Sequence, residues 1–221
     1  MHRPGLTGNT MRPFQQLFFF AVFVFDTVYT EVASASDSQQ STSADLDIIQ
    51  VFNTSDNLWI YSQSEPNSFE WTLGNGKVQM DEICIFITMI NMSESVYHYW
   101  RQAQLGEEQI FSQLRGDFDS NNDQAPISMK VTDVTAKIQS PYLLMTLVYS
   151  EPENGSCSVF STTALNDNNK NGCLMLVRKQ NDAVKPTNGC TKELQMISGE
   201  KTLYKPYKDN CEKQKDSNNW K

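Results

Sequence analysis

The sequence predicts an all-β protein, built as an antiparallel barrel or sandwich. Short segments rich in β-branched and aromatic residues recur from residue 58 onward, with polar turns between them. Segment 127–134 alternates apolar and polar residues, as expected of a strand with one buried face. The regular spacing of these segments favours antiparallel pairing over strand–helix–strand units.

The N-terminal segment predicts export rather than a fold. An unbroken apolar run, residues 17–25, follows Arg12, and Ala33-Ser34-Ala35 fits the small-x-small rule for signal peptidase. The run is too short to cross a bilayer, which takes about 20 apolar residues. We therefore predict a signal peptide over 1–35, a flexible N-terminus over 36–43 and one folded domain over 44–221. The mature protein is expected to be extracellular, with no membrane attachment.

Within the folded domain, a short helix over 44–52 precedes eight predicted strands. The strands are 58–61, 83–90, 96–101, 109–114, 127–134, 142–149, 157–163 and 173–179. Asn75-Gly76 signals a tight hairpin turn between the first two. Beyond Pro186, residues 189–197 predict a short C-terminal helix packed outside the strands.

Composition argues against several functions. Acidic side chains outnumber basic ones by 26 to 18, and a net charge of −8 disfavours binding to nucleic acid. Only His2 and His98 could supply an imidazole, and His2 falls in the signal peptide. Because hydrolase triads and most zinc sites need imidazoles, we expect no enzyme, no metal site and no cofactor.

An acidic loop at 117–123 imitates the start of a calcium-binding loop. Asn122 stands where such a loop needs glycine, and Ser128 stands where it needs glutamate. We therefore expect a solvated acidic loop there.

Cysteines and sequons agree with export. All five cysteines follow the predicted cleavage point, so they enter an oxidising compartment where disulfides form. Candidate N-glycosylation sites are Asn53, Asn91 and Asn154, each in an Asn-x-Ser/Thr motif.

Several motifs follow one another through most of the mature chain. They are Asn57-Leu58-Trp59, Cys84 within an apolar strand, Cys157-Ser158-Val159, Cys173-Leu174-Met175-Leu176, Pro186 to Cys190, and Tyr204 to Cys211. In order and spacing they resemble the tick salivary lipocalins, the family that includes the histamine-binding proteins. Three residues separate Pro186 from Cys190, whereas the family usually has two.

The resemblance implies an eight-stranded lipocalin barrel with two disulfides, Cys84–Cys211 and Cys157–Cys190. Cys173 is then left over, and we expect it to be buried and inert because it begins an apolar strand.

The family members that bind histamine hold the amine with inward carboxylates and aromatic walls. Here the matching positions carry Leu174, Met145 and Ser158, while Glu65, Glu70 or Asp133 could substitute. The expected inward set is apolar and aromatic: Trp59, Tyr61, Ile85, Ile87, His98, Trp100, Met129, Leu143, Met145, Leu147 and Leu174. Such a lining favours a lipid ligand, with His98 or Tyr61 as its polar contact. Alternatively, these side chains simply fill the barrel.

We therefore expect a secreted, monomeric salivary lipocalin that sequesters a small host inflammatory mediator and so helps to evade host defence. The family implies a biogenic amine such as histamine, whereas the residues favour a fatty acid or eicosanoid. The alternative is a protein–protein antagonist of host complement or immune cells, for which the barrel is only a scaffold.

Overall fold

The computed structural model describes residues 46–73, 76–119, 124–152, 155–166 and 168–212. The chain divides into two units, 1–39 and 40–221, and every described residue belongs to the second. The predicted signal peptide, the flexible N-terminus and Asn154 lie outside the described residues, as does part of the 117–123 loop. No helix within the described ranges is long and apolar enough to span a bilayer.

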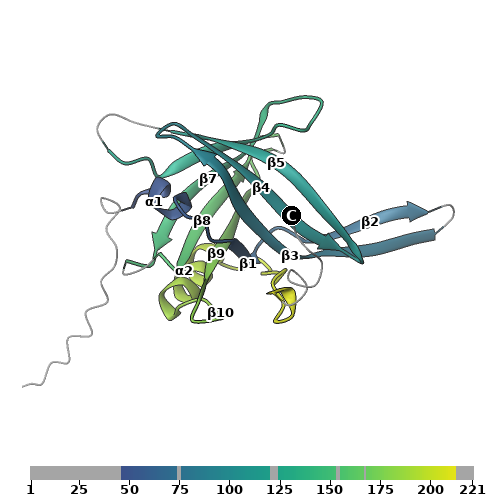
Figure 1. Ribbon diagram of the computed structural model, residues 1–221. Helices are drawn as coiled ribbons and strands as arrows, with labels where there is room; N and C mark the ends of the chain where they lie inside the picture. The colour runs from purple at the N-terminus through teal and green to yellow at the C-terminus, as the bar shows by residue number, and fades with distance from the viewer. Residues whose placement is uncertain (1–45, 74–75, 120–123, 153–154, 167, 213–221) are drawn as a thin grey trace, which may run out of the picture. The chain divides into compact units, whose positions relative to one another are not determined.

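Eight antiparallel strands close into a barrel (Figure 1). They are β1 (Leu58–Gln63), β3 (Gly76–Met92), β4 (Val96–Leu105), β5 (Glu108–Phe118), β6 (Ser128–Asp133), β7 (Pro141–Ser150), β8 (Cys157–Ala164) and β9 (Asn171–Gln180). Each pairs with the next along the chain, and β9 pairs back to β1. This closure, which leaves the barrel no free edge, confirms the predicted lipocalin-type fold and its eight strands.

Two further strands extend this barrel. β2 (Ser68–Leu73) pairs with residues 76–81 at the start of β3, and the two form a ribbon that runs beyond the barrel wall (Figure 1). β10 (Ala183–Val184) adds a short pairing to β9. The sequence did not predict β2. Asn75 of the predicted hairpin turn lies outside the described residues, but Leu73 and Gly76 on either side of the turn pair with each other.

A short helix, α1 (Ile48–Phe52), covers one end of the barrel (Figure 1). Asp47 caps its N-terminus by accepting a hydrogen bond from the Ile49 N–H. Phe52 is fully buried and stacks on Tyr97, with 4.7 Å between ring centroids. The N-terminal helix is therefore present, although it begins later than the predicted residue 44.

The second helix, α2 (Asn188–Ser198), packs outside the barrel near β7, β8 and β9, as predicted. Its buried Cys190 is joined to Cys157 of β8. The other disulfide joins Cys84 of β3 to Cys211, and Cys173 is buried and free. These are the two pairings that the family resemblance implied.

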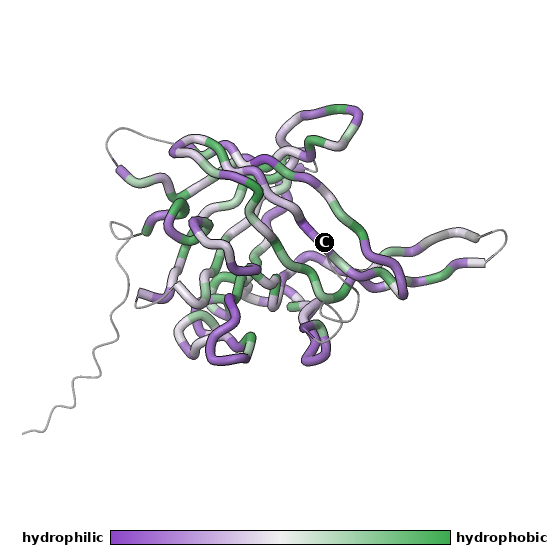
Figure 2. Tube along the Cα trace, viewed as in Figure 1, coloured by the Kyte–Doolittle hydropathy of each residue, from purple (hydrophilic) through white to green (hydrophobic). Residues whose placement is uncertain are grey.

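Buried side chains form two clusters because barrel strands bury residues on both faces. Apolar residues run along the barrel strands and alternate with polar ones (Figure 2). The inner cluster lies inside the barrel and contains, from the predicted inward set, Ile85, Ile87, Met129, Met145 and Leu147, with Leu143 and Leu174 packed against it. The outer cluster lies under α2 and the C-terminal segment.

The predicted inward placement is wrong for four residues. Trp59 and Tyr61 belong to the outer cluster, where Tyr207 of the C-terminal segment packs on them at ring distances of 5.4 and 5.5 Å. From outside the barrel, that segment covers Trp59, which is buried, and Tyr61, which is half-buried.

In β4, Tyr97 and Tyr99 point inward, which leaves His98 half-buried and Trp100 exposed on the outer face. Both faces of this strand carry aromatic residues, so alternation alone could not decide between them. Packing decides it, because Phe52 of α1 meets Tyr97 inside the barrel.

Candidate functional site

A β-bulge at Cys84 turns a carboxylate into the barrel. The β3–β4 register jumps from Ile83 opposite Gln104 to Phe86 opposite Gln102, and Cys84 adopts a left-handed φ of 53°. Strand alternation therefore changes phase at this point. Ile83 packs with the outer cluster, and Glu82 lines the interior instead.

A second irregularity acts in the same way on β1. The pairing of β1 with β9 shifts between Ile60 and Ser62, so one extra residue, Tyr61, enters the strand. As a result, Ile60 and Gln63 both line the interior, although they are three residues apart.

The interior retains a cavity of about 230 Å³. Its apolar wall comes from Ile60, Pro66, Phe69, Ile87, Leu114, Leu143, Met145 and Leu174, and Cys173 also lines it. Its polar lining comes from Gln63, Glu65, Glu82, Tyr99, Arg101, Tyr142 and Thr162. The far end of the barrel is filled, because Phe52 stacks on both Tyr97 and Phe160. The filled-barrel alternative thus describes only one end of the interior.

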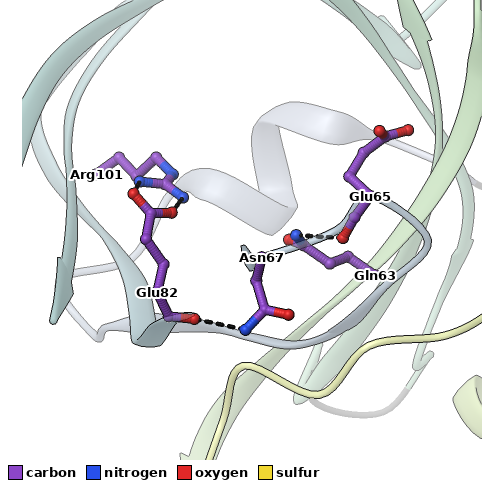
Figure 3. Close-up of polar contacts among 5 residues, drawn as sticks. All are labelled: Gln63, Glu65, Asn67, Glu82 and Arg101. Carbon is purple, nitrogen blue, oxygen red and sulfur yellow. Dashed lines mark hydrogen bonds and ion pairs between the residues drawn. The ribbon is translucent and has the colours of Figure 1, made fainter. Parts of the chain in front are cut away.

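Glu82 and Arg101 form the charged centre of the cavity (Figure 3). Arg101 donates through Nη2 to Glu82 Oε2 at 2.5 Å and through Nη1 to Oε1 at 3.5 Å. The Glu82 side chain is 9% exposed and that of Arg101 is 26% exposed. A two-pronged pair of this kind is geometrically specific, and removing either partner leaves a poorly solvated charge.

The loop between β1 and β2, residues 64–67, crosses the rim of the cavity. On the β3 side, Asn67 Nδ2 donates to the Glu82 carbonyl at 2.7 Å, and the Glu82 N–H donates to the Asn67 carbonyl at 2.7 Å (Figure 3). On the β9 side, the Ser64 N–H donates to the Cys173 carbonyl, and the Cys173 N–H donates to Ser64 Oγ, both at 2.8 Å. The loop is thus anchored to both walls.

Glu65 lies within this loop, at the outer part of the cavity. Gln63 Nε2 donates to its carbonyl at 2.8 Å (Figure 3). Lys170 Nζ lies 3.6 Å from its carboxylate. A Cβ added at Gly172 would lie 2.5 Å from Glu65 Oε1, so glycine there leaves room for the carboxylate.

Two tyrosines stand near the ion pair. Burial raises the pKa of Tyr99 well above its usual value, and the positive charge of Arg101 offsets only part of this rise. Burial likewise raises the pKa of Tyr142, which Arg101 lowers in part. Both phenols are therefore neutral near pH 7 and offer aromatic faces and hydroxyl groups to a ligand.

The structure brings together only part of the predicted site. Ile87, Leu143, Met145 and Leu174 line the cavity, whereas Ile85 and Met129 lie in the inner cluster without lining it. The predicted contacts on Trp59, Tyr61, His98 and Trp100 lie on the outer face. Among the proposed substitute carboxylates, Glu65 lines the cavity, while exposed Glu70 pairs with Lys77 outside it.

Sequence reasoning missed the polar lining, above all Glu82 and Arg101. Glu82 lies just before the predicted strand 83–90, and only a bulge brings it inside. Arg101 ends the predicted strand 96–101 and shares its face with Tyr97 and Tyr99, so a correct face assignment for that strand would have found it. Within the described ranges, no group of three or more His, Cys, Asp or Glu residues could hold a metal ion.

No family model matches the chain, and no curated protein matches it. Solved structures that resemble the chain include the two that follow. The AM182 serotonin complex shows 12% identity and a TM-score of 0.47, covering 71% of this chain and 85% of that one. The siderocalin Ex-FABP, described as having dual ligand specificities, shows 6% identity and a TM-score of 0.42, covering 67% and 90%. Both TM-scores lie below 0.5, and the barrel is identified by its own closed strand pairing.

Proposed function

We propose that this protein binds and sequesters a compact small molecule with an apolar body and a cationic amine. The observation that carries the proposal is a buried carboxylate, Glu82, set in an apolar cavity beside two neutral phenol rings. An ammonium group removed from water needs an opposite charge or aromatic faces around it. The phenol rings supply the aromatic faces, and Glu82 supplies the charge when the ammonium takes the place of Arg101.

The size of the cavity supports a compact ligand. Pockets for drug-sized ligands range from about 300 to 1,000 Å³, and this cavity has about 230 Å³. A small aromatic amine suits that volume better than a long-chain lipid held whole. The expectation of a lipid rested on an apolar lining, to which Glu82, Arg101 and Gln63 must now be added.

The biological role follows from binding alone. A protein that holds a host mediator lowers its free concentration in proportion to affinity and abundance, without any turnover. The predicted signal peptide and the two disulfides support action outside the cell, and the resemblance to tick salivary lipocalins supports an inflammatory mediator as the ligand.

Two observations favour other ligands. Arg101 could pair with the carboxylate of a fatty acid or eicosanoid whose tail leaves through the mouth of the cavity. On the β2–β3 ribbon, the exposed Phe69 and Val78 share one face, which favours the alternative of a host-protein partner.

Calorimetric titration with histamine, serotonin and a fatty acid tests the proposal. We expect saturable one-to-one binding of an amine, weakened by Leu143→Trp, which fills the cavity. Trp100→Ala on the outer face is the matched control and should bind as the unmodified chain does. Binding of the fatty acid alone would favour the lipid ligand. No binding of any of the three by folded protein would contradict small-molecule sequestration of these classes.

A further inference from the structure

Arg101 holds the position that a cationic ligand needs. We propose that Arg101 is a built-in counter-ion, which competes with an amine for Glu82 and so sets the charge preference of the cavity. This inference rests on the proposed function and identifies the residue that limits it. Both carboxylate oxygens of Glu82 face guanidinium nitrogens of Arg101.

The two partners are held differently. The Glu82 backbone is fixed on both sides by Asn67, and it lies next to the bulge that the Cys84–Cys211 disulfide ties to the C-terminal segment. Arg101 reaches the pair through a long side chain that is nearly three times as exposed as that of Glu82. When an ammonium enters, Arg101 is therefore the partner that moves.

The pair leaves hydrogen-bonding capacity for a ligand. A carboxylate accepts about four hydrogen bonds and a guanidinium donates five, while the two groups share two. The displaced guanidinium stays near the Tyr99 and Tyr142 rings, whose pKa values already respond to its charge.

Opposite effects on amines and acids follow from this arrangement. Arg101→Gln removes the competitor and should tighten histamine binding by five-fold or more. The same change should weaken binding of octanoate, because an acid loses its cationic partner. Glu82→Gln should do the reverse, abolishing histamine binding and freeing Arg101 for octanoate.

The test is calorimetric titration of histamine and octanoate into the unmodified chain, Arg101→Gln and Glu82→Gln. The matched control is Lys77→Gln, which breaks an exposed pair with Glu70 on the ribbon and should alter neither affinity. Because Arg101→Gln leaves a poorly solvated carboxylate, Arg101→Lys is the second variant. Lysine cannot form the two-pronged contact, so we expect an intermediate gain for histamine.

The outcomes separate this inference from the proposed function. If the unmodified chain binds histamine and the Arg101 variants bind it more tightly, both stand. If the variants fold and bind it equally or less tightly, the counter-ion role is overturned while amine binding stands. If the Arg101 variants bind histamine and the unmodified chain does not, Arg101 is the counter-ion and the native ligand is not histamine-like. If no folded form binds either probe, both proposals fail.

Discussion

Asn67 holds the Glu82 backbone from both sides, through its own carbonyl oxygen and its side-chain amide, each at 2.7 Å. Both residues are buried. Because Glu82 lies two residues before the Cys84 bulge, this contact fixes the backbone where strand alternation changes phase. Asn67 therefore acts as a positioning residue for the cavity carboxylate.

Asn67→Ala should destabilise the protein and weaken amine binding together. The Glu82 carbonyl loses a buried donor, which costs about 1–3 kcal/mol. The Glu82 carboxylate then loses its fixed orientation in the cavity, so the affinity for histamine should fall several-fold. Urea denaturation and calorimetry measure the two effects. The control is Ser68→Ala, which removes the exposed hydroxyl of the residue that follows Asn67 in the chain. Equal losses of stability and affinity in the two variants would contradict the positioning role of Asn67.

Arg178 ties α1 to the end of the barrel. Its Nη2 atom donates to the Val51 carbonyl at 2.6 Å and lies 3.4 Å from the Gln50 carbonyl. Arg178→Met should cost about 2 kcal/mol, since hydrogen bonds to charged groups contribute about 1.5–3 kcal/mol. It should also speed amide exchange in α1. Lys179→Met breaks only ion pairs of a solvent-exposed lysine and should cost much less than Arg178→Met. Equal losses of stability in the two variants would contradict the role of Arg178 in holding α1 to the barrel.

Stability should fall at alkaline pH because of the buried tyrosines. Burial raises the pKa of Tyr97, Tyr99 and Tyr142. An unfolded tyrosine has a pKa of about 10, so the folded chain holds these protons where the unfolded chain has released them. Their contribution is complete below about pH 10 and is lost as the pH rises toward the raised values. Urea midpoints between pH 8 and 11 measure this, and Tyr97→Phe should flatten the decline. A decline of the same steepness in Tyr97→Phe would show that Tyr97 plays no part.

Cys173 should resist alkylation in the folded protein. The residue is only 1% exposed, and burial raises the pKa of its thiol, which reduces the fraction of reactive thiolate. Iodoacetamide followed by mass spectrometry should find Cys173 unmodified in native protein and fully labelled in urea. Rapid labelling without urea would show that this part of the cavity wall opens readily.

Much of the fold was predictable from local patterns. The eight barrel strands stand out because runs such as 142–149 are apolar, β-rich and bounded by turns. The C-terminal helix follows Pro186 and is capped by Thr187, both of which are local signals. β2 was missed although Phe69, Trp71 and Thr72 favour a strand, because the turn residues on either side of it, Pro66-Asn67 and Gly74-Asn75-Gly76, favour one continuous loop.

The cavity was predictable only where alternation ran without interruption. On β7, Leu143 and Met145 fall on the expected face. On β3, the bulge stands at Cys84, a residue whose side chain gives no local signal for a left-handed backbone. Its position is fixed by contacts far along the chain, since the Cys84 N–H donates to the Pro206 carbonyl at 2.9 Å and its sulfur is bonded to Cys211. Such distant contacts leave no trace in local periodicity.

The most direct test of ligand binding in the barrel is methyl NMR of the unmodified chain during titration with histamine. We predict saturable shifts for the cavity methyl groups of Ile60, Ile87, Leu143 and Leu174, with little change at Ile83, Val184 and Leu194 of the outer cluster. Shifts confined to the outer cluster, or none at saturating histamine, would contradict the account.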